Sequence, residues 1–120
     1  MNETVTIIIP FVPPTINKYI GRSNIFEYQK DKKNVHKAIS LLTSQVGKEF
    51  NINKCKMTIT YYFKDRRRHD PANYDKFILD GLVEAGVITD DNYSVITEFT
   101  TKGGYDKENP RTEIIIDIIE

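Results

Sequence analysis

The chain has 120 residues and a mass of 13.9 kDa, the size of one domain, and no apolar run approaches the ~20 residues that span a bilayer. Hydrophobic residues make up 39% of the chain, which is enough for a packed core. A single cysteine, Cys55, excludes an intramolecular disulfide and a multi-cysteine zinc site. The N-terminus lacks the features of a secretory signal. We therefore expect a single cytoplasmic domain over residues 1–120, without a membrane partner.

Basic and acidic side chains are segregated along the chain, although the net charge is zero. Residues 18–68 carry 13 basic and 4 acidic side chains, whereas residues 69–120 carry 4 and 12. A basic half favours a polyanionic partner, and an acidic half can supply carboxylates to a metal ion. The pattern suggests a metal-dependent enzyme that acts on nucleic acid. The alternative is that the two halves dock and neutralise each other.

The first half of the chain predicts a strand, a helix and a second strand. Residues 4–9 are mostly β-branched, and Pro10 ends this strand because proline cannot donate to a sheet ladder. Residues 29–48 carry apolar side chains at spacings of three and four, which is typical of an amphipathic helix, and Gly47 marks its end. Residues 55–64 alternate between apolar and polar side chains. The buried face of this strand would carry Cys55, Met57, Ile59, Tyr61 and Phe63.

The second half predicts another helix and two more strands. Asp70-Pro71 opens the helix, since aspartate is a favoured N-cap and proline is favoured at the first helical position. Residues 93–101 and 112–119 predict strands that could pair as a hairpin across a loop at 102–110. The expected fold class is α+β: a mixed sheet of about four strands, in the order strand-helix-strand-helix-strand-strand, flanked by two helices.

The segment 65–92 concentrates the candidate functional residues. Arg66–Arg68 can pair with phosphates bidentately. Asp70 follows at the helix N-terminus, and the acidic turn at Asp90–Asp91 comes some twenty residues later. Phosphodiester hydrolysis needs a hard cation held by carboxylates and a positive group for the developing charge. Asp70 with the acidic turn could supply the first and Lys76 the second, provided that the chain folds the turn back beside Asp70.

Each of these features also has a purely structural explanation. Asp70 is sufficiently explained as an N-cap, and Asp90–Asp91 as part of a turn. Lys76 could simply pair with Asp80 one helical turn further on. Arg66–Arg68 could be a solvated strand end. The residues alone leave these alternatives open.

The run KDRRRHDPANYDKFILDGLVEAGVITDDNYSV resembles the signature region of the RusA family of Holliday-junction resolvases, small enzymes often carried by phages and prophages. The shared pattern is a basic cluster, a helix-opening aspartate, an Asn and a Lys in the helix, a Leu-Asp-Gly-Leu segment and an Asp-Asp turn. These elements are Arg66–Arg68, Asp70, Asn73, Lys76, Leu79–Leu82 and Asp90–Asp91. Weaker similarities at the two ends of the chain are Pro13-Pro14, Asn17-Lys18 and Pro110–Glu113.

The resemblance implies a RusA-like fold and a homodimeric endonuclease of DNA recombination and repair. It implies that the enzyme depends on Mg²⁺ or Mn²⁺, uses no small-molecule cofactor and cuts four-way DNA junctions by paired nicks. Asp70 and Asp91 would be metal-binding catalytic carboxylates, and Lys76 would be the catalytic lysine. The residues expected to contact DNA are Arg66, Arg67, Arg68, Asn73, Lys64 and Lys18.

One position departs from the family pattern. The family commonly has Asp-x-Asp-Asn, whereas residues 70–73 are Asp-Pro-Ala-Asn. Ala72 cannot bind a metal, so either Asp75 or Asp90 compensates, or water fills the vacant ligand position, as magnesium permits. Two alternatives to the enzyme stay open, of which Ala72 favours the first. One is a junction-binding protein with little cleavage activity, and the other is a general nucleic-acid-binding module whose acidic half is structural.

Overall fold

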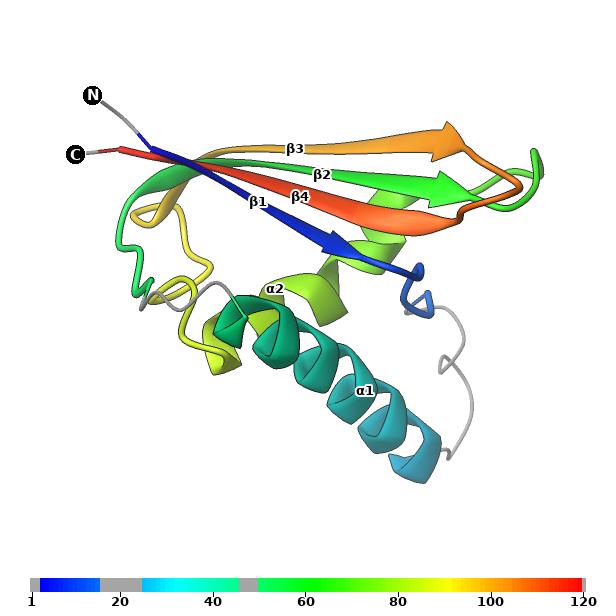
Figure 1. The fold of residues 1–120 in the computed structure, drawn as a ribbon, viewed down its shortest axis with the longest axis horizontal. Coiled ribbons are helices and arrows are strands. Elements are labelled where there is room, and N and C mark those ends of the chain that lie inside the picture. The colour runs from blue at the N-terminus through cyan, green and yellow to red at the C-terminus, as the bar shows by residue number, and fades with distance from the viewer. Residues whose placement is uncertain (1–2, 16–24, 46–49, 120) are drawn as a thin grey trace.

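The computed structural model describes residues 3–15, 25–45 and 50–119, so Asn17, Lys18 and Gly47 lie outside the described residues. In chain order its elements are β1 (Thr4–Ile9), α1 (Ile25–Ser44), β2 (Cys55–Phe63), the 3-10 helix η2 (Pro71–Tyr74), α2 (Asp75–Glu84), β3 (Ile96–Tyr105) and β4 (Arg111–Ile118). The four strands form one mixed sheet in the order β1-β4-β2-β3. Both α-helices lie on the same side of the sheet (Figure 1). The predicted α+β class and element order are confirmed.

The pairing of the last two strands differs from the prediction. β4 pairs antiparallel with β1 and with β2, whereas β3 pairs with β2 and runs parallel to it. The expected hairpin between β3 and β4 is therefore wrong, because β2 lies between them. A parallel neighbour needs a crossover connection, and η2 with α2 supplies it.

The element boundaries differ from the predicted ones most in three elements. α1 begins at Ile25, four residues before the predicted start. The helix predicted from Asp70 is a 3-10 helix followed by a short α-helix. β3 begins at Ile96, three residues after the predicted start because residues 93–95 form a turn, and it continues to Tyr105 through a stretch predicted as loop, because the two glycines there allow close approach. A Cβ at Gly104 would lie only 2.9 Å from the ring of Tyr62, so this strand position accepts no side chain without a shift.

The core lies between the two helices and one face of the sheet. The predicted buried face of β2 is confirmed, with all five of its side chains buried. The helices contribute Val35, Ile39, Phe77, Ile78 and Leu82 to the same core. Gly81 lets α2 approach α1 closely, since a Cβ there would lie 2.6 Å from Ile39 Cδ1. This packing fixes α2 and the η2 turn before it against the sheet.

None of the described helices lies on the other face of the sheet (Figure 1). Along β4, Ile114 and Ile116 are buried under the helices while Ile115 is exposed on the open face, as the strand period requires. Ile8 of β1 is also exposed there. The remaining side chains of this face are mostly threonines and charged groups, such as Thr58, which pairs with Thr100.

Candidate functional site

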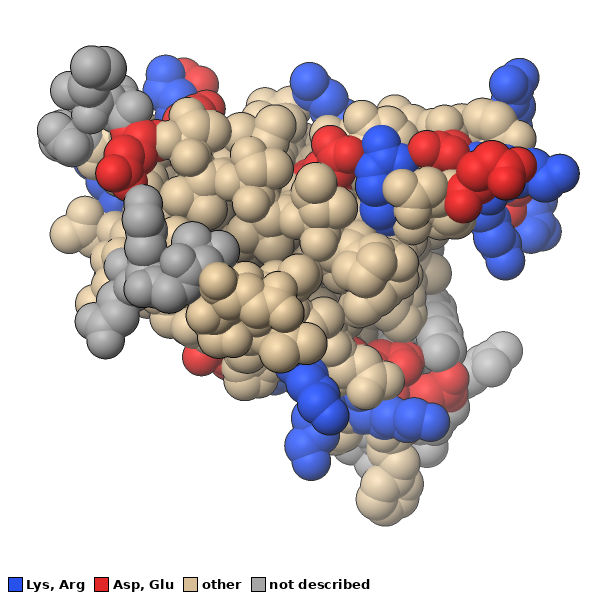
Figure 2. All heavy atoms as spheres, in the orientation of Figure 1, with Lys and Arg blue, Asp and Glu red and all other residues tan. Residues whose placement is uncertain are grey.

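The basic cluster lies at the end of the sheet where β2 and β3 finish. Arg66–Arg68 follow β2 closely and are exposed, and Figure 2 shows Lys/Arg and Asp/Glu side chains crowded at this end. The Arg66 guanidinium stacks over the ring of Tyr105 at 4.5 Å. Within residues 3–15, 25–45 and 50–119, the ion pairs of the Arg67 and Arg68 guanidinium groups are long, at 3.5 Å to Asp65 and to Asp70 respectively. Such exposed ion pairs are weak, so the guanidinium groups are free to exchange them for phosphates.

Asp70 immediately precedes η2. Its backbone carbonyl accepts a hydrogen bond from the Asn73 N–H at 2.9 Å, but its side chain makes no capping hydrogen bond. The side chain is 57% exposed, and its closest charged partner among the described residues is Arg68. Capping therefore explains the position of the Asp70 backbone but leaves its carboxylate available to a ligand.

A histidine ties the strand end to η2. His69 Nε2 lies 2.8 Å from Asp65 Oδ1, and His69 Nδ1 lies 3.2 Å from the hydroxyl of Tyr74. The imidazole also stacks on the ring of Phe63, with 4.0 Å between centroids. The hydrogen bonds from His69 and from the Arg67 N–H lower the pKa of Asp65. The four-residue spacing of Asp65 and His69 is the sequence signal for this contact, and no motif in the sequence singles out His69.

Asp75 anchors the first turn of α2 to the sheet. Its Oδ1 accepts hydrogen bonds from the Tyr61 hydroxyl at 2.5 Å and from the Thr101 hydroxyl at 3.2 Å. The residue is only 8% exposed, and burial raises the pKa of its carboxyl group while the two hydrogen bonds oppose that shift. The sequence suggested Asp75 as a compensating metal ligand. In the structure these hydrogen bonds join α2 to β2 and β3 through its carboxylate.

The other candidates near this end are less constrained. Lys64 directly follows β2, and Asn73 lies within η2. Lys76 Nζ lies 3.5 Å from Asp80, which is the helical pair that the structural explanation of Lys76 predicts. The lysine side chain is 49% exposed, so this pair contributes little free energy and does not bury the charge.

Asp90 and Asp91 lie at the opposite end of the sheet, in the turn that leads from α2 into β3. The Asp90 carboxylate shapes this turn by accepting hydrogen bonds from the Asp91 N–H at 2.7 Å and from the Asn92 side-chain amide at 3.1 Å. Both aspartates are exposed. Within the described part of the chain the Asp91 carboxylate has no partner of its own, so it is presented to solvent.

The two ends stay apart within one chain. β2 has nine residues, and at about 3.3 Å per residue it separates the two ends by about 26 Å. Figure 1 shows the turn before β3 and the loop after β2 at opposite ends of the sheet. Among residues 3–15, 25–45 and 50–119, no three His, Cys, Asp or Glu side chains gather to hold a metal ion. The arrangement that the sequence-based metal site requires, with Asp70 beside the acidic turn, is therefore not formed within a single chain.

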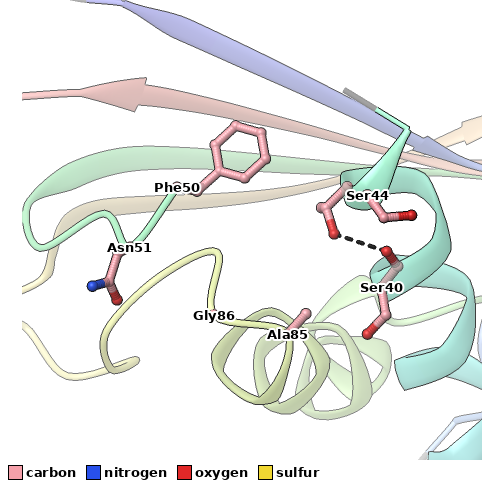
Figure 3. Close-up of a pocket in the computed structure, with 7 residues that line it drawn as sticks. Ser40, Ser44, Phe50, Asn51, Ala85 and Gly86 are labelled. Atoms are coloured by element: carbon pink, nitrogen blue, oxygen red, sulfur yellow. Dashed lines mark hydrogen bonds between the residues drawn. The ribbon is translucent and has the colours of Figure 1, made fainter. Parts of the chain in front are cut away.

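A cavity of about 430 Å³ elsewhere in the fold has a different chemistry. It lies between the end of α1 and the segments before β2 and after α2 (Figure 3). Ser40, Thr43 and Ser44 line one wall, and the Thr43 hydroxyl donates to the α1 carbonyls. The described side chains that line it carry no charge. The cavity therefore lacks the groups that phosphodiester hydrolysis needs.

Three solvent-facing arginines beside an exposed carboxylate, at one end of a small α+β domain, are typical of proteins that act on nucleic acid. The family model of endodeoxyribonuclease RusA matches residues 10–117, nearly the whole chain. The chain therefore belongs to the RusA family of endodeoxyribonucleases, as its signature region predicts. No curated protein matches the chain. The described helices include none that is long and apolar enough to cross a membrane.

Proposed function

We propose that this protein is a metal-dependent, structure-selective DNA endonuclease that resolves Holliday junctions by paired nicks in recombination and repair. The observation that carries the proposal is the exposed carboxylate of Asp70 beside Arg66–Arg68 in a chain of the RusA family. Carboxylate oxygens suit Mg²⁺ and Mn²⁺, and guanidinium groups suit phosphate. When bound, the cation would lower the pKa of a water and neutralise charge on the scissile phosphate.

We further propose that the complete site needs two copies of the chain. If a two-fold axis relates two protomers whose sheets lie side by side and point in opposite directions, the Asp70 end of one protomer would lie beside the Asp90–Asp91 turn of its partner. The two ends have complementary charge, which favours this pairing. Symmetry repeats the site once, and two equivalent sites match a four-way junction that must be cut on two strands.

The side chains then have separate roles. Asp70 of one protomer and Asp91 of the other would hold the cation, while Asp90 holds the turn that presents Asp91. Water would fill the ligand position that Ala72 cannot supply. Asp75 is left out of the ligand set because its carboxylate is buried and bonded to the sheet. Lys76 would exchange Asp80 for the scissile phosphate and stabilise the negative charge of the transition state.

A junction-binding protein with little cleavage activity is the second candidate. It is favoured by Ala72, which stands where the family commonly has an aspartate. In this reading the arginines hold DNA, but the carboxylates do not assemble into a working site. A general binding module explains Asp70 less well, because an exposed carboxylate beside phosphate-binding arginines repels the phosphates.

The test is cleavage of a synthetic four-way junction and of a matched linear duplex, each with Mg²⁺, with Mn²⁺ and with a chelator. We expect symmetrical nicks in the junction that depend on the metal, and binding without cleavage of the duplex. If the wild-type protein binds junctions but cuts none of them in either metal, and Ala72→Asp gains cleavage, the binding-protein candidate is correct.

A further inference from the structure

A cavity of about 440 Å³ beside the basic end is not used by the proposed nuclease site. Its volume is in the range of small-molecule pockets. Most of its lining side chains are rings: Phe11, Phe63, His69, Tyr74, Pro10 and Pro110. Lys64 and Asp65 add two charged groups to the same wall. A flat aromatic ligand with polar edges therefore fits its chemistry.

The rings of this aromatic cavity hold one another in place. His69 stacks on Phe63 with an interplanar angle of 7°, and Tyr74 lies 5.3 Å from Phe63 between centroids. The two hydrogen bonds of His69, to Asp65 and Tyr74, fix the imidazole from both sides. Preorganised rings lose little conformational entropy when a ligand binds, so this wall is suited to binding.

A second hollow, of about 370 Å³, adjoins the aromatic cavity and carries the arginines. Phe63, Asp65 and His69 line both spaces. The rest of the second hollow is formed by Arg66, Arg67, Gly103, Gly104 and Tyr105. The hollow lined by the arginines, which attract phosphate, thus shares one wall with the aromatic cavity. Together the two spaces match the size of a single nucleotide.

We propose that the aromatic cavity binds one unstacked nucleobase of a DNA strand whose phosphate is held by Arg66 and Arg67. Stacking platforms beside backbone-binding cations are what single-stranded nucleic acid requires. A base in regular duplex cannot reach the cavity without leaving its stack, whereas a base that is already unpaired pays little to do so. The inference rests on the proposed function and deepens it, because such a subsite would favour branch points over duplex.

Phe11 is the residue to test, because it lines the aromatic cavity from the segment that follows β1 and does not belong to the end of β2. Its carbonyl accepts the Thr112 hydroxyl at 2.8 Å, a backbone contact that Phe11→Ala retains. Phe11→Leu keeps apolar volume and removes only the ring. Phe26→Ala is the matched control, since Phe26 is 87% exposed on α1 and lines none of these spaces. Thermal unfolding is measured for each variant to check that it is folded.

The measurement compares the affinity for an oligothymidylate, for a strand of equal length with abasic nucleotides, and for a linear duplex. We expect Phe11→Ala to weaken oligothymidylate binding by roughly 5- to 100-fold, with Phe11→Leu between it and wild type. Binding of the abasic strand and the duplex should change less than about twofold, because the arginine contacts remain. Unchanged oligothymidylate binding, or an equal loss on all three ligands in a folded variant, would overturn the inference. Junction cleavage is scored separately, so failure of the subsite and failure of the nuclease proposal are distinguishable.

Discussion

The two ends of the parallel β2–β3 pair differ in how their charged side chains are held. At the basic end, His69 and Asp75 link the strand end, η2 and α2 through hydrogen bonds and ring stacking. At the acidic end, the hydrogen bonds that the Asp90 carboxylate makes with described residues stay within its own turn, and Asp91 is presented to solvent. The basic end is thus held by contacts between elements, whereas the acidic end presents the Asp91 carboxylate to solvent, and only the proposed composite site would bring it to Asp70 of a partner.

The largest expected effect is the loss of cleavage when either end loses a carboxylate. Asp70→Asn and Asp91→Asn keep the side-chain shape but remove the charge that holds a cation. Each should lower the junction cleavage rate by at least roughly 100-fold. Junction binding, measured by gel shift, should survive or tighten because less negative charge faces the phosphates. Glu98→Gln, which removes an exposed carboxylate from the open face of the sheet, is the control. If all three variants cleaved the junction at the same rate, neither Asp70 nor Asp91 would have a role in cleavage.

Lys76 separates the catalytic explanation from the structural one. If Lys76 stabilises the transition state, Lys76→Ala should slow cleavage by roughly 100-fold in single-turnover kinetics. Asp80→Ala removes the same helical pair but leaves the lysine, so it should cleave at nearly the wild-type rate. Equal slowing by both variants would mean that the pair matters only for the helix.

The arginines should act through phosphate charge at the basic end alone. Replacing Arg66–Arg68 by alanine should reduce the salt dependence of DNA affinity by roughly 0.9 for each lost contact, on junction and duplex alike. Replacing Lys30, Lys33 and Lys37 on α1 by alanine removes the same formal charge and should leave that slope nearly unchanged. If both triple variants changed the salt dependence of DNA affinity equally, that affinity would depend on the overall charge of the protein and not on Arg66–Arg68.

The smallest effect is a pH dependence of stability at the basic end. Burial raises the pKa of Asp75, so its contribution is fully present below the unfolded pKa of about 3.9 and is lost as pH rises through the raised value. From pH 4 to 7, Asp75→Asn should therefore gain unfolding free energy relative to wild type. Asp65 has a lowered pKa, so Asp65→Asn should lose unfolding free energy relative to wild type as pH rises through the range between the folded and unfolded values. Urea unfolding from about pH 2 to pH 7 covers both windows and tests both signs, and variant curves parallel to that of the wild type would contradict them.

Sequence periodicity predicted the elements better than their pairing. The alternation in 55–64 identified the buried face of β2, because inward side chains obey a local period. The neighbours of β2 depend on contacts distant in sequence, so the hairpin prediction failed. Gly103 and Gly104 were predicted as loop because no local sequence pattern indicates their close contacts with neighbouring rings.

The sequence points to the candidate residues, but their arrangement in space does not follow from it. Arg66–Arg68 and Asp70 do share one end, since they are adjacent in sequence. Asp91 is separated from Asp70 by a helix that crosses the sheet and returns the chain to the start of β2. The anchoring role of Asp75 depends on Tyr61 and Thr101, which no local pattern connects to it.

Mixing Asp70→Asn with Asp91→Asn tests the central claim, that two copies build each site. The two variants are co-expressed with different affinity tags, and the heterodimer is purified through both tags. In this heterodimer one composite site keeps both carboxylates, Asp70 from one protomer and Asp91 from the other, and the second composite site has lost both. We predict that this heterodimer nicks a four-way junction in Mg²⁺ at about half the wild-type rate per dimer, on one strand only. Each homodimer should be inactive. A purified heterodimer as inactive as both homodimers, under conditions in which the wild type cuts, would contradict the account.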